Sequence, residues 1–176
     1  WKNIDKFILF LILFLFSLGL FFSLVSTSII ASDKLNTNTY YFFIKHLLFF
    51  ILGVIIIITF SAIDKARLLQ ISKYLFIIFF IFLALVPFIG VEVKGSARWI
   101  DLPGIPRFQP IEILKPFLII MISTVFTLSN QKSIYFKYLF SFLIIFPVIL
   151  FLISQPDIGQ TILIVLTWFS LIFVSG

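Results

Sequence analysis

Residues 74–91 have the sequence YLFIIFFIFLALVPFIGV, which contains no charged side chain. This length is close to the roughly 20 residues that a helix rising 1.5 Å per residue needs to cross about 30 Å of hydrocarbon. Five more charge-free stretches of similar length follow or precede it, at residues 7–32, 46–63, 116–131, 138–156 and 158–176. We therefore predict an all-α polytopic integral membrane protein with six transmembrane helices, which form a single transmembrane domain over residues 1–176.

The composition excludes several classes of function. Only 11% of the 176 residues are charged, whereas a soluble domain is about 25% charged. The chain has no cysteine, which excludes disulfides and thiolate metal sites, and the lone His46 cannot form a histidine cluster. The net charge of +6 comes from basic residues scattered over short loops, so no nucleic-acid partner is expected.

The orientation of the predicted spans follows from their number. Six spans place both ends of the chain on one side of the membrane and residues 92–115 on the other, and the Lys and Arg counts of the two sides are nearly equal. Because residues 92–115 have the composition of a folded element, we expect them outside and the termini in the cytoplasm. We also expect a fragment of a longer protein, since the chain begins at Trp1 and ends at Gly176 directly after an apolar run.

Residues 92–115 differ in composition from the other connections. They hold seven of the twenty charged residues, three of the seven prolines and two of the seven glycines. Cationic and apolar side chains alternate there, with Lys94, Arg98 and Arg107 among them, which suits a loop in the headgroup layer. We predict an outer-face interfacial loop that binds an anionic lipid; a stabilising loop without a ligand is the alternative.

The end of this segment, QPIEILK at residues 109–115, has the features of a helix start. Pro110 suits the first helical position, and Glu112 in the first turn is favoured by the helix dipole. Lys115 follows three residues later and can pair with Glu112. A surface ion pair worth about 0.5 kcal/mol is one interpretation. The apolar sequence after Lys115 favours a pair that faces a cavity, because an inserted cation costs roughly 2.5 to 3.5 kcal/mol.

A second Gln-Pro-acid motif, QPDIG, lies at residues 155–159. Its Asp157 is the only charged residue between positions 138 and 176. Two predicted spans separate Glu112 from Asp157, so both carboxylates emerge on the same face of the membrane, as do Arg98 and Lys115. We expect these groups to meet in one cleft, where the cations bind a phosphate and the carboxylates position a metal, a cation or a hydroxyl.

Three motifs together resemble the SEDS family of shape, elongation, division and sporulation proteins. They are GVEVKGSARWI at 90–100, QPIE at 109–112 with Lys115, and QPDIG at 155–159. The resemblance is greatest to the cell-division branch, FtsW, with the elongation branch RodA close to it, and it implies about ten spans, of which six are present here. Ile111 stands where the family usually has Ser, and Gln160 where it has Thr or Ser. We expect both departures to weaken a hydroxyl contact and to leave the charged groups untouched.

The resemblance implies that the intact protein is a peptidoglycan glycosyltransferase, a lipid II polymerase of septal cell-wall synthesis during bacterial cell division. The catalytic aspartate of the family lies in a loop after the sixth span, so no catalytic residue is expected here and this fragment alone should be inactive. Glu112, Lys115 and Asp157 are expected to support catalysis. A divalent cation is the candidate cofactor. The residues expected to bind substrate are Arg98, Trp99, Gln109, Lys115 and Gln155.

Two other functions fit the same residues. One is a lipid II flippase, and the other is a scaffold without catalysis. The resemblance also implies partners and a location: lipid II, a class B transpeptidase and other divisome proteins, at the septum in the bacterial inner membrane. The clustering of charges on one face of the predicted bundle argues against a polar path through these six spans.

Overall fold

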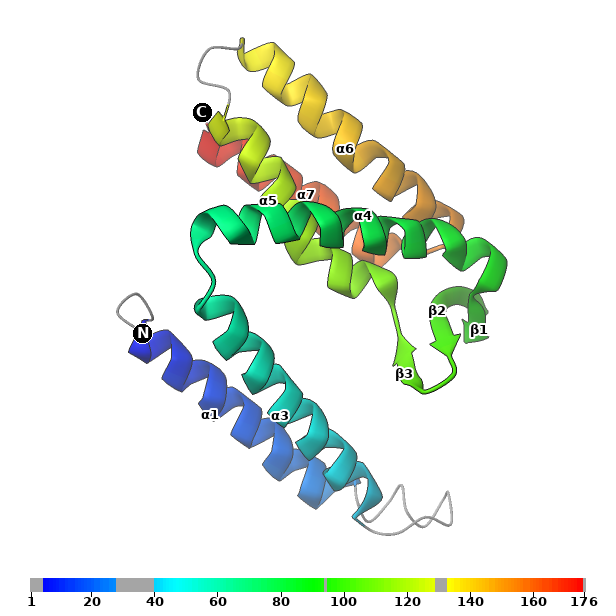
Figure 1. Ribbon diagram of the computed structural model, residues 1–176. Coiled ribbons are helices and arrows are strands. Elements are labelled where there is room, and N and C mark those ends of the chain that lie inside the picture. Colours follow the sequence, from blue (N-terminus) through cyan, green and yellow to red (C-terminus); the bar gives the residue numbers. More distant parts are fainter. Residues whose placement is uncertain (1–4, 28–39, 94, 129–132, 176) are drawn as a thin grey trace. The chain divides into compact units, whose positions relative to one another are not determined.

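The computed structural model describes residues 5–27, 40–93, 95–128 and 133–175 (Figure 1). Within these ranges, six helices are long and apolar enough to cross a membrane, which confirms the predicted fold. The chain forms two compact units, residues 1–64 and 65–176. The ends of the chain and residues 33–39 of one predicted loop lie outside the described residues, and the cytoplasmic placement of the termini stays a prediction.

The first unit is a pair of antiparallel helices. They are α1 (Lys6–Phe22), which continues into the π-helical turn η1 (Ser23–Thr27), and α3 (Tyr41–Ser61). Asp5 caps α1, because its carboxylate accepts hydrogen bonds from the backbone N–H groups of Phe7 and Ile8. Neither α1 nor α3 has a buried residue, and both are apolar over most of their surface. Such surfaces suit a lipid environment.

The second unit packs four helices around an apolar core (Figure 1). The helices are α4 (Lys65–Ile89), α5 (Pro110–Leu128), α6 (Ile134–Ser154) and α7 (Ile158–Ser175). Each helix contributes buried side chains, and the outward faces remain apolar and exposed. The buried core consists of Leu83, Ile111, Leu114, Leu118, Ile122, Phe126, Ile145, Val148, Leu152 and Ile164.

The connection between α4 and α5 contains a small sheet that the sequence did not predict. Its strands are β1 (Val91–Val93), β2 (Ser96–Leu102) and β3 (Ile105–Phe108), in the antiparallel order β1-β2-β3. Gly95 and Gly104 have φ angles of 82° and 80° in the two tight turns, a conformation that favours glycine. β1 and β3 are too short for a clear alternating pattern, and the burial of the seven residues of β2 does not alternate. The interfacial location of this segment stays a prediction, and Lys94 lies outside the described residues.

The helices extend beyond the charge-free stretches and include charged residues near their ends. Lys45, Lys73 and Lys137 lie inside helices, as do Glu112 and Lys115. A charged side chain near a helix end can extend its polar group toward water while its stem remains among apolar groups. The position of a charge therefore marks the end of the apolar span and not the end of the helix.

Gly90 joins α4 to β1 at a point of close contact. Its N–H donates to the carbonyl of Val86 at 2.8 Å, and a Cβ atom at this position would lie 2.4 Å from the same oxygen. Gly90→Ala should therefore shift the start of the sheet and lower the free energy of unfolding by about 2 kcal/mol. Chemical unfolding in mixed micelles measures this change.

The matched control for Gly90→Ala is Gly159→Ala. A Cβ atom at Gly159 would meet nothing within 4 Å, and alanine has the higher helix propensity. This variant should be as stable as the parent protein or slightly more stable. Equal stability of the two variants would contradict the structural role assigned to Gly90.

Candidate functional site

Arg98 of β2 connects the sheet to the turn between α6 and α7. Its guanidinium donates to the carbonyl of Pro156 and, through Nε at 3.3 Å, to the carbonyl of Gln155. Its Nη1 lies 3.6 Å from Oδ1 of Asp157. The Asp157 side chain is only 7% exposed and that of Arg98 is 32% exposed. This cation therefore holds the α6–α7 turn against the sheet.

Asp157 is a buried carboxylate that precedes the first residue of α7. Besides Arg98, it accepts a hydrogen bond from Nε2 of Gln109 at 3.0 Å and one from the backbone N–H of Gln160 at 3.4 Å. The second bond is a helix N-cap, and the helix dipole favours a negative charge at this end. Asp157 thus links three parts of the chain, which are β2, Gln109 just before α5, and the first turn of α7.

The predicted pair between Glu112 and Lys115 is present. Lys115 Nζ lies 2.6 Å from Oε2 of Glu112, on the first two turns of α5. The lysine side chain is 19% exposed and the glutamate side chain 49% exposed. The pair is therefore partly shielded from water on the lysine side and exposed on the glutamate side. That it faces a cavity stays a prediction.

The expectation that Gln160 leaves the charged groups untouched was wrong. Its Nε2 donates to Oε1 of Glu112 at 2.6 Å, and its Oε1 accepts from Lys115 Nζ at 3.0 Å. Gln160 lies three residues after Asp157, on the first turn of α7, and its side chain is long enough to reach α5. Its spacing from Asp157 was the available signal, but the distance to α5 depends on how the two helices pack.

Together these contacts form one polar network at the end of the four-helix unit that carries the sheet. The Arg98–Asp157 pair and the Glu112–Lys115 pair are joined through Gln160, which contacts Asp157 with its backbone and the other pair with its side chain. The structure thus brings together the four charged groups that the sequence places on one face. Their roles toward a substrate stay predictions.

Two other residues expected to bind substrate have different surroundings. Gln155 is buried, and its Nε2 donates to the carbonyl of Leu83 at 3.2 Å, which links the α6–α7 turn to α4. Trp99 lies in β2 opposite Val91 and is half-buried. Among the described residues with an expected binding role, Trp99 is the one outside the hydrogen-bonded network.

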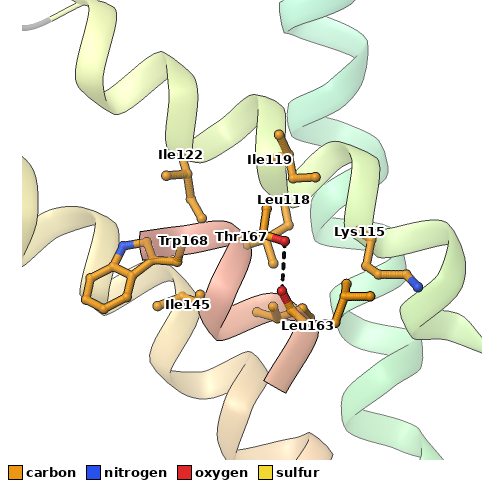
Figure 2. Close-up of a pocket in the computed structure, with 9 residues that line it drawn as sticks. Lys115, Leu118, Ile119, Ile122, Ile145, Leu163, Thr167 and Trp168 are labelled. Carbon is orange, nitrogen blue, oxygen red and sulfur yellow. Dashed lines mark hydrogen bonds between the residues drawn. The ribbon is translucent and has the colours of Figure 1, made fainter. Parts of the chain in front are cut away.

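An apolar pocket borders the network on the membrane-spanning side (Figure 2). Figure 2 shows Lys115 at one end of the pocket, with its ammonium turned away from the apolar side chains. The space inside the pocket is about 20 Å³, which is enough for one water molecule but not for a sugar. Its lining comprises Lys115, Leu118, Ile119, Ile122, Ile145, Leu163, Ile164, Thr167 and Trp168.

Metal ligands are sparse in the described ranges, which contain no group of three or more His, Cys, Asp or Glu side chains. The carboxylates of Glu112 and Asp157 each face a cation of the protein. A divalent cation at this site would need further oxygen ligands from elsewhere, as Mg²⁺ often obtains from phosphates. The predicted cation therefore stays a prediction.

Comparisons with curated proteins give relatives that include FtsW proteins. The chain is 29% identical over 153 residues to the probable peptidoglycan glycosyltransferase FtsW of Aliivibrio salmonicida, covering 86% of this chain and 38% of that protein. It is 33% identical over 180 residues to the protein of the same name from Coxiella burnetii, covering 98% of this chain and 47% of that protein. The chain thus spans less than half the length of these relatives.

Two solved structures share the fold. Thermus thermophilus RodA, a rod shape determining protein, matches with a TM-score of 0.80 at 22% identity, over 100% of this chain and 55% of that one. A structure described as the structural coordination of polymerization and crosslinking by a peptidoglycan synthase complex matches with a TM-score of 0.77 at 23% identity, over 100% of this chain and 49% of that one. At this level of identity the similarity shows the fold.

A family model gives the assignment directly. The model of the FtsW, RodA and SpoVE proteins, described as cell cycle proteins, matches residues 6–176. This match covers all six described membrane-spanning helices and the polar network of the second unit. The resemblance to the SEDS family is therefore confirmed, and the chain is a multi-pass membrane protein that belongs to the FtsW/RodA/SpoVE family.

Proposed function

We propose that the whole protein is a peptidoglycan glycosyltransferase that polymerises lipid II in septal cell-wall synthesis. The observation that carries the proposal is the Lys115 ammonium, held between Glu112 and Gln160 beside a second, partly buried ion pair. A fixed and partly shielded cation suits the recognition of a pyrophosphate. The names of the curated relatives support the same activity.

The proposed reaction joins two glycan units at a pyrophosphate-activated carbon. The 4-hydroxyl of one sugar attacks the anomeric carbon of the other, a C–O bond forms, and the bond to the lipid pyrophosphate breaks. The hydroxyl proton passes to a carboxylate, which the family resemblance places after residue 176. An ammonium has three N–H donors, and Lys115 uses two of them for Glu112 and Gln160. The third is proposed to bind the leaving pyrophosphate and stabilise its developing charge.

The other network residues are proposed to shape the site. Arg98, Gln109 and Gln155 all donate to groups of the protein, and Asp157 is almost fully buried. These contacts support a role in fixing the α6–α7 turn beside Lys115. Trp99 remains the proposed substrate contact within the sheet.

A divalent cation is also proposed, with Glu112 as one ligand. Glu112 has the more exposed of the two carboxylates in the network, and substrate phosphates would provide the remaining oxygen ligands. The cation would offset the charge of the pyrophosphate while the protein's own residues hold Lys115 in place.

The location and partners follow from the same proposal. We propose the bacterial inner membrane at the division septum, with lipid II as substrate and a class B transpeptidase and other divisome proteins as partners. The similar complex that coordinates polymerization and crosslinking supports a transpeptidase partner. The described charged residues of the membrane-spanning helices lie toward helix ends, which gives a flippase path no support in this part of the chain.

The test reconstitutes the whole protein in vesicles with fluorescent lipid II offered only on the side corresponding to the outer face. Glycan chains seen on a gel are the expected result, and headgroup translocation without polymer would instead indicate a flippase. Residues 1–176 purified alone should make no glycan, because the expected catalytic aspartate lies after them. Polymer made by residues 1–176 would overturn this last prediction.

A further inference from the structure

Gln160 is the residue through which α7 contacts the charged pair of α5. Its backbone N–H donates to Asp157 at 3.4 Å, so the residue is held at the first turn of α7. Its side chain is half-buried and spans the distance to α5. A primary amide suits this position because it offers a donor and an acceptor on one rigid group.

The two ends of this amide meet groups of opposite charge. The oxygen accepts from Lys115 at 3.0 Å, and the nitrogen donates to Glu112 at 2.6 Å. The reverse orientation would place the amide N–H₂ against the ammonium and the carbonyl against the carboxylate. The two charges therefore select one orientation of the amide, and the amide in turn restrains both side chains.

Without the amide, the pair would be less constrained. Lys115 would lose one of its two acceptors, and Glu112, whose side chain is 49% exposed, would lose its contact with α7. An ion pair with one exposed partner is weak and tolerates several geometries. The three-group arrangement is more restrictive than the i,i+3 pair by itself.

We propose that Gln160 is a positioning residue, which holds the Lys115 ammonium and the Glu112 carboxylate in the geometry that the proposed pyrophosphate contact needs. The kinetic part of this inference rests on the proposed function. The structural part concerns the environment of the Lys115 amine and can be tested without any activity.

The first test measures how fast an amine-directed acetylating reagent modifies Lys115 in the whole protein in nanodiscs, by mass spectrometry. Hydrogen bonds that hold the Lys115 amine in place slow the reaction. Gln160→Met removes one acceptor at similar size and should raise the rate at least about fivefold, because the amine is then held by Glu112 alone. Gln160→Glu retains size and an acceptor and should lower the rate, because a charge-assisted hydrogen bond to a carboxylate holds the amine more tightly than one to an amide.

The opposite signs of the two effects separate positioning from general loosening. A loosened structure would raise the rate in both variants, and that result, or no change in either, would overturn the inference. Gln70→Met, at an exposed position on the first turns of α4, is the matched control and should leave the rate unchanged. Lys137 in the same protein serves as an internal reference for reagent access.

The second test measures the polymerisation kinetics of the same proteins. Gln160→Met should reduce kcat about tenfold and change KM by less than about twofold, because the contact matters most as charge develops on the leaving group. An active parent protein with unchanged kcat in Gln160→Met would refute the positioning role and leave the proposed function intact. An inactive parent protein with the expected changes in Lys115 reactivity would refute the function and leave the positioning of Lys115 intact.

Discussion

Asp157→Asn should lower the free energy of unfolding by about 2 kcal/mol and reduce lipid II polymerisation by the whole protein at least about a hundredfold. The carboxylate is buried and faces Arg98, Gln109 and the backbone N–H of Gln160. Removing one member of a fully buried pair costs about 3 to 5 kcal/mol. The lower value expected here reflects the partial exposure of Arg98.

The loss of activity has a separate cause from the loss of stability. Asp157 orients the first turn of α7, from which Gln160 reaches Lys115. An asparagine has one N–H₂ group where the carboxylate has an oxygen, so that at least one of the three donors loses its acceptor. The turn and the amide of Gln160 should then shift together. Chemical unfolding in mixed micelles and the vesicle polymerisation assay measure the two effects.

Asp101→Asn is the matched control for Asp157→Asn. Asp101 pairs with Arg107 at 2.6 Å on the surface of the sheet, where both side chains are nearly half exposed. An exposed pair of this kind contributes little, and the same substitution should change stability by no more than about 0.5 kcal/mol. An equal loss of stability in the two variants would contradict the structural role assigned to Asp157.

Lys115→Met should reduce kcat for polymerisation about a thousandfold, with a smaller effect on stability. Methionine retains the apolar stem that borders the pocket of Figure 2 and removes only the ammonium. Loss of one preorganised donor to a developing anion costs about a hundredfold to a thousandfold in rate. The loss of a full positive charge beside a pyrophosphate belongs at the upper end of that range. Single-turnover kinetics with lipid II measures the effect.

Lys137→Met provides the comparison at the other end of α5. Lys137 Nζ donates to the carbonyl of Phe126 at 3.1 Å, near the C-terminal end of that helix. This variant loses a contact to a helix terminus, so stability should fall by about 1 kcal/mol while kcat stays within about twofold. A polymerisation rate for Lys115→Met equal to that of Lys137→Met would remove Lys115 from the proposed mechanism.

The sequence predicts the features that depend on residues close together in the chain or on the thickness of the membrane. The six helices follow from the length of the charge-free stretches, because the thickness of the hydrocarbon sets the length of a span. The start of α5 at Pro110 and the contact of Lys115 with Glu112 follow from local geometry, since residues three apart share a helix face. The common face of Glu112 and Asp157 follows from the number of spans between them.

The sheet and the partners within the site depended on the tertiary structure. β1 and β3 have only 3 and 4 residues, and the burial of the 7 residues of β2 does not alternate. Their pairing depends on two tight turns and on the packing below them. The contacts of Arg98 with the α6–α7 turn cross 57 and 58 positions of sequence, and its expected contact with a phosphate stays a prediction. Gln160 meets Glu112 across 48 positions. Such contacts depend on how α5 packs against α7. A side chain reaches only a few ångströms, and the packed core sets the distance between the two helices.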